Sequence, residues 1–120
     1  MKDFKRDENF NTENARLLAK TRLELREKLY GTDIFADCLF NSFRDLEIGN
    51  VRYDDSEYII TIEEDNYIPI SIEDLRDALN TCLNMLSNRV LDKSVFSNKT
   101  FNVNELYTIT KIGSYIYIYL

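Results

Sequence analysis

The sequence predicts an α+β fold, in which an antiparallel sheet of about four or five strands packs against about three helices. Apolar residues recur at helical spacing in three stretches, and they alternate with polar residues in others. Turn-forming residues separate these stretches. The expected order is α-α-β-β-(β)-α-β-β, where the bracketed strand is a short edge segment. We expect one domain over residues 12–120, preceded by a flexible tail over residues 1–11.

Two helices are predicted near the start of the chain, joined by a Gly-Thr-Asp link that suits a helical hairpin. Asn11 or Thr12 is expected to cap the first helix, and Gly31 to end it. Asp33 is expected to cap the second helix. The predicted core-facing residues are Ala15, Leu18, Leu25 and Leu29 in the first helix, and Ile34, Phe35, Cys38, Leu39, Phe43 and Leu46 in the second.

A β-hairpin is predicted over residues 51–62, because apolar residues alternate on both sides of the turn formers Asp54, Asp55 and Ser56. A second turn follows at residues 63–66. It leads to a possible edge segment over residues 67–70, where Pro69 lacks an amide donor and excludes a central strand.

The third helix is predicted to begin after Ser71, which resembles the first residue of a capping box. Its core-facing residues are expected to be Leu75, Leu79, Cys82, Leu83 and Leu86. Residues 87–104 are polar and are expected to be irregular, with one apolar pair at Val95 and Phe96.

The chain continues into a final hairpin whose turn is predicted at Gly113-Ser114. A two-residue turn pairs Thr110 with Tyr117, so one face of the hairpin becomes a row of tyrosines and threonines. The other face carries Ile116, Ile118 and Leu120. Two interpretations of the tyrosine face stay open: a surface for a partner, or a second core layer under the first helix.

Several kinds of catalytic site are excluded by composition. The chain contains no His, two Cys and three Gly. It therefore lacks nucleophile–His pairs, His-ligated metals, a four-cysteine zinc site and a glycine-rich phosphate loop. We expect no catalytic residues, no cofactor and no metal, with a carboxylate–metal enzyme as a distant alternative. Cys38 and Cys82 are expected to be buried free thiols.

The negative charge is concentrated in one part of the sequence. The net charge is −6, yet residues 45–77 hold eleven acidic residues against Arg52 and Arg76. Such a concentration repels nucleic acid and anionic membranes, and it attracts basic partners. No apolar run is long enough to cross a bilayer, and residues 1–10 do not resemble a secretory signal. We expect a cytoplasmic protein.

These features favour a small acidic inhibitor that binds a basic protein, such as an immunity protein that neutralises a toxin or nuclease domain. A phage-encoded inhibitor belongs to the same physical class. The alternative is a structural or regulatory subunit that forms a homo-oligomer through its sheet edge or its tyrosine face. The candidate partner-binding residues are Asp54, Asp55, Glu57, Glu63, Glu64, Asp65, Tyr115, Tyr117 and Tyr119.

Overall fold

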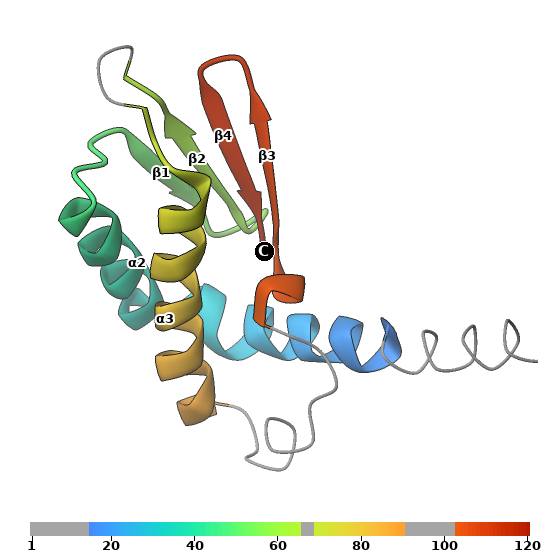
Figure 1. The fold of residues 1–120 in the computed structure, drawn as a ribbon. Coiled ribbons are helices and arrows are strands. Elements are labelled where there is room, and N and C mark those ends of the chain that lie inside the picture. The colour runs from blue at the N-terminus through green and yellow to red at the C-terminus, as the bar shows by residue number, and fades with distance from the viewer. Residues whose placement is uncertain (1–14, 66–68, 91–102) are drawn as a thin grey trace, which may run out of the picture.

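The fold is described from a computed structural model, which covers residues 15–65, 69–90 and 103–120. The predicted tail, the predicted caps Asn11 and Thr12, and the apolar pair Val95 and Phe96 lie outside these ranges. Within them, helices cover one face of a four-stranded sheet (Figure 1), and the predicted α+β class is confirmed.

The helices follow one another closely at the start of the described chain. Residues 15–25 are α-helical and continue into a π-helical turn, η1 (Arg26–Tyr30), which ends at Gly31. Helix α2 (Asp33–Asp45) follows, and α3 (Ile72–Val90) comes later in the chain. A short 3₁₀ helix, η2 (Val103–Leu106), precedes the final hairpin.

The sheet has the strand order β1-β2-β4-β3, and all neighbours are antiparallel. Its strands are β1 (Val51–Asp54), β2 (Ile59–Glu63), β3 (Thr108–Ile112) and β4 (Tyr115–Tyr119). Both predicted hairpins are confirmed. At the second turn, Gly113 has φ +61° and Ser114 has no positive φ. This combination, with a positive φ at the first central residue alone, is that of a type II′ turn.

The core lies between the sheet and the helices α2 and α3. Side chains that point to this side from the two central strands are fully buried, namely Ile60, Ile62, Ile116 and Ile118. They meet Leu75, Leu79 and Leu83 of α3 and Phe35, Leu39 and Phe43 of α2, which belong to the same apolar cluster. Each such side chain contributes about 1.5–3 kcal/mol by leaving water.

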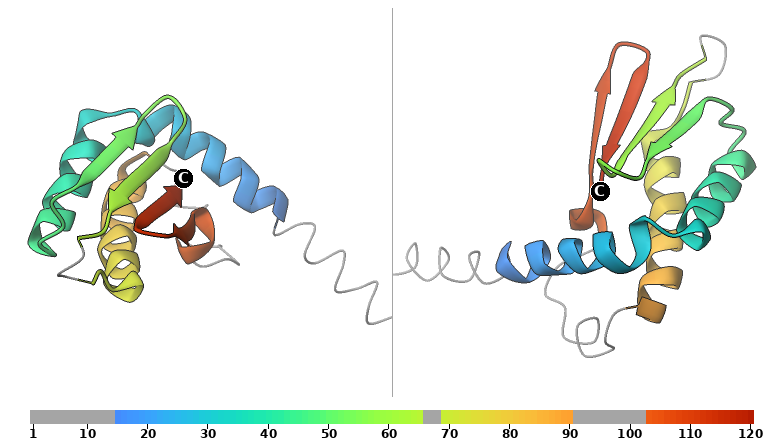
Figure 2. Two further views of the ribbon diagram at one scale, coloured as in Figure 1. Left: turned by 90° about the horizontal axis from the view of Figure 1, so that it is seen from above. Right: turned by 180° about the vertical axis from the view of Figure 1, so that it is seen from behind.

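The first helix lies across one end of the strands, beside Leu120 (Figure 2). The Nη2 atoms of Arg22 and Arg26 each donate a hydrogen bond of 2.9 Å to the carbonyl oxygen of Leu120. The Leu120 amide donates to the Tyr58 carbonyl at 2.9 Å, and the Arg26 guanidinium lies 5.0 Å from the centre of the Tyr58 ring. These contacts fix the end of β4 against the helix and the β1–β2 turn.

Five local predictions differ from the structure. Thr32, and not Asp33, caps α2, because its hydroxyl accepts a hydrogen bond of 3.3 Å from the Phe35 amide. Asp33 is the first helical residue, where a negative charge is favourable. Ile34 is 59% exposed, since Phe35 and its partners one and two turns later occupy the core face.

Ala15 is also exposed, because the buried part of the first helix begins further along the chain, at Thr21. The predicted irregular segment starts too early, since α3 continues to Val90. The bracketed edge strand is not present at Pro69 and Ile70, which belong to no strand; residues 66–68 lie outside the described ranges. The third helix is otherwise as predicted, with Ser71 Oγ accepting a hydrogen bond of 3.3 Å from the Asp74 amide.

Candidate functional site

Three tyrosines of β4 lie in a row on the sheet face that is turned away from α2 and α3. The ring centres of Tyr115 and Tyr117 are 6.3 Å apart, and those of Tyr117 and Tyr119 are 6.4 Å apart, with interplanar angles of 24° and 29°. Tyr115 is 41% and Tyr119 is 39% exposed. The predicted pairs Thr110–Tyr117 and Thr108–Tyr119 are confirmed.

Within the described residues, no helix lies over this face of the sheet (Figure 2, right). The first helix lies at the end of the strands, and the interpretation that it forms a second core layer over the tyrosine row is therefore wrong. We call this side of the sheet the outer face. Residues paired across it form three rows, which are Asp54-Ile59-Tyr119-Thr108, Arg52-Thr61-Tyr117-Thr110 and Glu63-Tyr115-Ile112.

Pairing between β2 and β4 brings the candidate acids and the tyrosines onto one surface. Glu63 lies beside Tyr115 in the register, and Asp54 lies in the same row as Tyr119. The acids therefore flank the tyrosine row at both ends of the sheet. The sequence allowed such an arrangement, but only the order β1-β2-β4-β3 creates it.

The acidic residues of the β1–β2 turn differ in their surroundings. One oxygen of Asp54, Oδ1, accepts hydrogen bonds from the Ser56 hydroxyl at 2.6 Å, the Ser56 amide at 2.9 Å and the Glu57 amide at 3.2 Å. These bonds favour the ionised form and lower the pKa of Asp54. Asp54 therefore shapes the turn, whereas the side chains of Asp55 and Glu57 are exposed to solvent.

The acids at the opposite end of the sheet are also divided. Glu63 is exposed on the outer face. Glu64 points to the other side, where its carboxylate forms an ion pair of 2.8 Å with Lys111 and is only 14% exposed. The bond from Lys111 lowers the pKa of Glu64. Asp65 is exposed beyond the end of β2. Glu64 is thus a structural carboxylate, whereas Glu63 is exposed on the outer face.

A hollow of about 230 Å³ indents the outer face beside Tyr115. Its charged side chains are Glu63 and Arg52, and Thr61 forms part of its wall. The remaining lining comes from the segment that enters β1, at Gly49, Asn50 and Val51. The hollow offers an aromatic ring, a carboxylate and a guanidinium within one depression.

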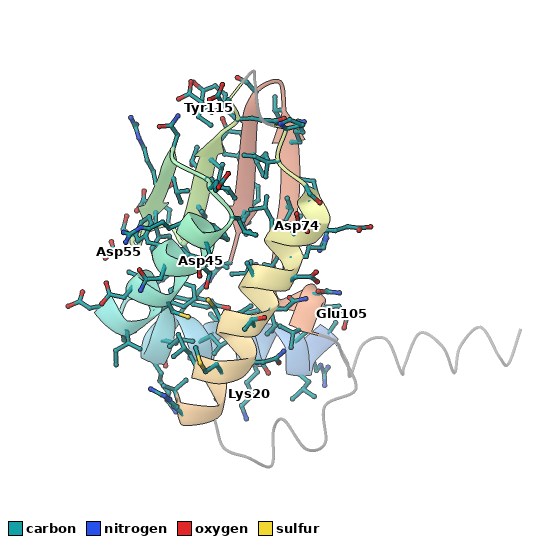
Figure 3. All side chains as sticks on the ribbon, turned by 60° about the vertical axis from the view of Figure 1, so that its left-hand side comes forward. Lys20, Asp45, Asp55, Asp74, Glu105 and Tyr115 are labelled. Carbon is teal, nitrogen blue, oxygen red and sulfur yellow. The ribbon has the colours of Figure 1, made fainter. Side chains whose placement is uncertain are left out.

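A second pocket, of about 260 Å³, lies where α2 ends and α3 begins. Four acids line it, namely Glu47, Glu63, Asp65 and Asp74, around an apolar wall formed by Leu46, Ile48, Pro69 and Ile70. Figure 3 shows Asp74 on α3 and Asp45 on α2 together on the helical side, with Tyr115 at the opposite end of the sheet from Asp55.

Glu47 and Asp74 were not among the candidate residues predicted from the sequence. Both belong to the acid-rich stretch over residues 45–77, and that stretch was the only signal that pointed to them. Their approach to Glu63 depends on the packing of α2 and α3 on the sheet, which local sequence patterns do not encode.

Within the described ranges, no group of three or more Cys, Asp and Glu side chains is arranged to hold a metal ion. None of the helices there is both long enough and apolar enough to span a bilayer. No protein-family model, no curated protein and no solved structure matches the chain.

Proposed function

We propose that the protein is a small, acidic, non-catalytic inhibitor that binds a basic protein through its outer face. The target class that fits best is a toxin or nuclease-like domain, so the protein would act as an immunity protein or as a phage-encoded inhibitor in the cytoplasm. The observation that carries this proposal is an open aromatic sheet face with acidic residues at both ends.

The tyrosine row supplies the anchoring area. Tyrosine offers a large and rigid contact surface with a hydroxyl at its rim, and it is enriched among residues that dominate binding energy. The three stacked rings on β4 present such a surface between the Thr108/Thr110 side and the β2 side. Tyr115 and Tyr119 are exposed, and Tyr117 is half-buried between them, so a partner can contact all three rings.

The hollow beside Tyr115 indicates which side chains a partner would present to this face. An arginine or lysine side chain entering it meets the Glu63 carboxylate and the Tyr115 ring, which offer an ion pair and a cation–π contact. Arg52 in the same hollow favours a partner that also presents an acceptor. At the other end, Asp55 and Glu57 add negative potential that steers a basic surface toward this face.

The partner is identified first, by capture from the lysate of the source cells on immobilised protein followed by mass spectrometry. A parallel column carries Tyr117→Ala. The proposal expects a basic protein that binds the wild type, elutes with added salt and is absent from the variant column. A basic protein that binds both columns equally would overturn the assignment of the outer face.

The kinetics then separate steering from anchoring. Asp55→Lys with Glu57→Lys should slow association by about 10-fold at low salt. Tyr117→Ala should mainly accelerate dissociation, by about 10-fold or more. Asp37→Lys, which changes an exposed acid of α2 on the other side of the molecule, is the matched charge control, and Phe40→Ala is the aromatic control. Both controls should bind like the wild type.

A second candidate function is self-assembly, favoured by the free edge of β3. Among the residues that the structure describes, this strand pairs with β4 alone, and its Ile112 side chain is 61% exposed. Light scattering on the purified protein distinguishes the two functions. A homo-oligomer that dissociates with Tyr117→Ala, and is unchanged by Asp55→Lys with Glu57→Lys, would favour a structural or regulatory subunit.

A further inference from the structure

The two cysteines of the chain meet between α2 and α3. The Sγ atoms of Cys38 and Cys82 lie 2.8 Å apart, although the residues are 44 positions apart in the sequence. Carbon atoms in good contact are about 3.5–4.0 Å apart, and sulfur is larger than carbon. Both thiols are free, as predicted, but only Cys82 is fully buried, and the two form a pair in close contact.

The two members of the pair differ in accessibility. Cys82 is fully buried, whereas Cys38 is half-buried at the surface of α2. Burial and the contact with Cys38 raise the pKa of Cys82 to about 12, and the nearby Ser42 hydroxyl, with Oγ 3.1 Å from the Cys82 Sγ, opposes this only in part. A thiol reagent from solution therefore reaches the pair through Cys38.

We propose that Cys38 and Cys82 form a reversible disulfide-exchange site, which reacts with low-molecular-weight disulfides such as glutathione disulfide and links α2 to α3. This inference is independent of the partner proposed above. The pair lies between the helices and not on the outer face, so its oxidation leaves the tyrosine row exposed.

The reaction has two steps. In the first, the Cys38 thiolate attacks one sulfur of glutathione disulfide, forming a mixed disulfide and releasing one glutathione thiolate, which takes up a proton. In the second, Cys82 gives up its proton, its thiolate attacks the Cys38 sulfur, and the second glutathione leaves as a thiolate that takes up a proton. Two protein thiols are oxidised, and one glutathione disulfide is reduced to two glutathione molecules. Excess glutathione reverses both steps.

The close approach of the sulfurs predicts that the second step outcompetes retention of the mixed disulfide. The link closes a loop of 44 positions and so reduces the conformational freedom of the unfolded chain. Oxidised protein should therefore melt at a temperature higher by about 5 °C or more than reduced protein.

The test uses the full chain, reduced and then incubated with glutathione disulfide at increasing ratios to glutathione. Free thiols are alkylated and counted by intact-mass spectrometry. The wild type should lose both alkylatable thiols and the mass of two hydrogen atoms, keep no glutathione and recover both thiols with dithiothreitol. A wild type that keeps both thiols, retains glutathione or forms only disulfide-linked dimers would overturn the proposal.

Two single variants test the assigned roles. Cys82→Ser should retain one glutathione on Cys38, because the thiol that resolves the mixed disulfide is missing. Cys38→Ser should keep its single thiol free, because Cys82 is buried. Equal glutathione attachment to both variants would contradict entry through Cys38. The wild-type thiol count and its melting temperature, with and without reductant, decide the proposal even if a variant does not fold.

Discussion

The two faces of the sheet are built from the same strands and differ completely in their surroundings. On the inner face, Ile116 and Ile118 of β4 are fully buried under α2 and α3. On the outer face, Tyr115 and Tyr119 of the same strand are about two-fifths exposed. One alternating segment thus supplies both the core and the candidate binding surface, because successive side chains of a strand point to opposite faces.

The apolar character of β4 therefore has two separate physical roles. The isoleucines stabilise the fold, and their replacement should be seen in unfolding experiments. The tyrosines contribute area and hydroxyl groups to an exposed surface, and their replacement should be seen in binding. Tests of the comparison should therefore use chemically identical changes on opposite faces.

The largest expected difference comes from removing an isoleucine side chain on each face. Ile118→Ala should lower the free energy of unfolding by about 2–5 kcal/mol, because it leaves a cavity among Ile60, Ile109 and the helices. Ile112→Ala makes the same change at a side chain that is 61% exposed, and should cost less than about 1 kcal/mol.

Urea denaturation of both variants, with the slope of the transition as a check on two-state unfolding, measures the difference. Similar losses for both variants would mean that the outer face is covered in solution, for example by another copy of the chain. The two-layer description would then be wrong.

The sequence was sufficient to predict each hairpin, but not how the hairpins meet. Gly113-Ser114 sets the β3–β4 register locally, and the alternation in residues 115–120 identifies the buried side chains. The pairing of Ile59 with Tyr119 joins residues that are far apart in sequence, and no local pattern specifies such a neighbour. The surface shared by acids and tyrosines follows from that pairing.

Single-residue roles within the candidate site were also beyond the sequence. Glu63 and Glu64 are identical and adjacent, yet one faces solvent and the other is paired with Lys111. Alternation predicts that they lie on opposite faces, but the presence of a lysine opposite Glu64 depends on the neighbouring hairpin. Asp54 is the exception, because it was predicted as a turn former, and its Oδ1 accepts the hydrogen bonds from Ser56 that shape the turn.

A smaller effect is expected where the first helix holds the end of β4. Arg26→Gln removes a charged hydrogen-bond donor to the Leu120 carbonyl and the contact with the Tyr58 ring. We expect a loss of about 1.5–3 kcal/mol in the free energy of unfolding. Arg22→Gln should cost less, because no contact with the Tyr58 ring is lost with it.

Thermal and urea unfolding measure both losses of stability, and hydrogen exchange shows which backbone amides of β4 lose protection. The Leu120 amide, which donates to the Tyr58 carbonyl, should lose protection in Arg26→Gln more than the Tyr117 amide in the middle of β4. Equal loss at both amides would show that the arginines stabilise the whole strand and not its end. With either result, the side chains of β4 still alternate between the inner and the outer face of the sheet.

The smallest effect concerns the two adjacent carboxylates at the end of β2, and it depends on pH. Because Lys111 lowers the pKa of Glu64 below the value in the unfolded chain, the ion pair stabilises the fold fully only above that unfolded value, roughly pH 4.3. The stabilisation decreases as the pH falls from there through the folded pKa.

Glu64→Gln should therefore be less stable than the wild type near pH 7, and the difference should disappear under acid conditions. Lys111→Gln should reproduce this behaviour, and the double variant should add nothing to it. Glu63→Gln, which removes the exposed carboxylate one residue earlier, should leave the melting temperature at pH 7 nearly unchanged. Melting temperatures of the four variants between pH 3 and pH 7 test this prediction. A larger loss from Glu63→Gln than from Glu64→Gln would reverse the assignment of the two carboxylates to the outer and inner faces.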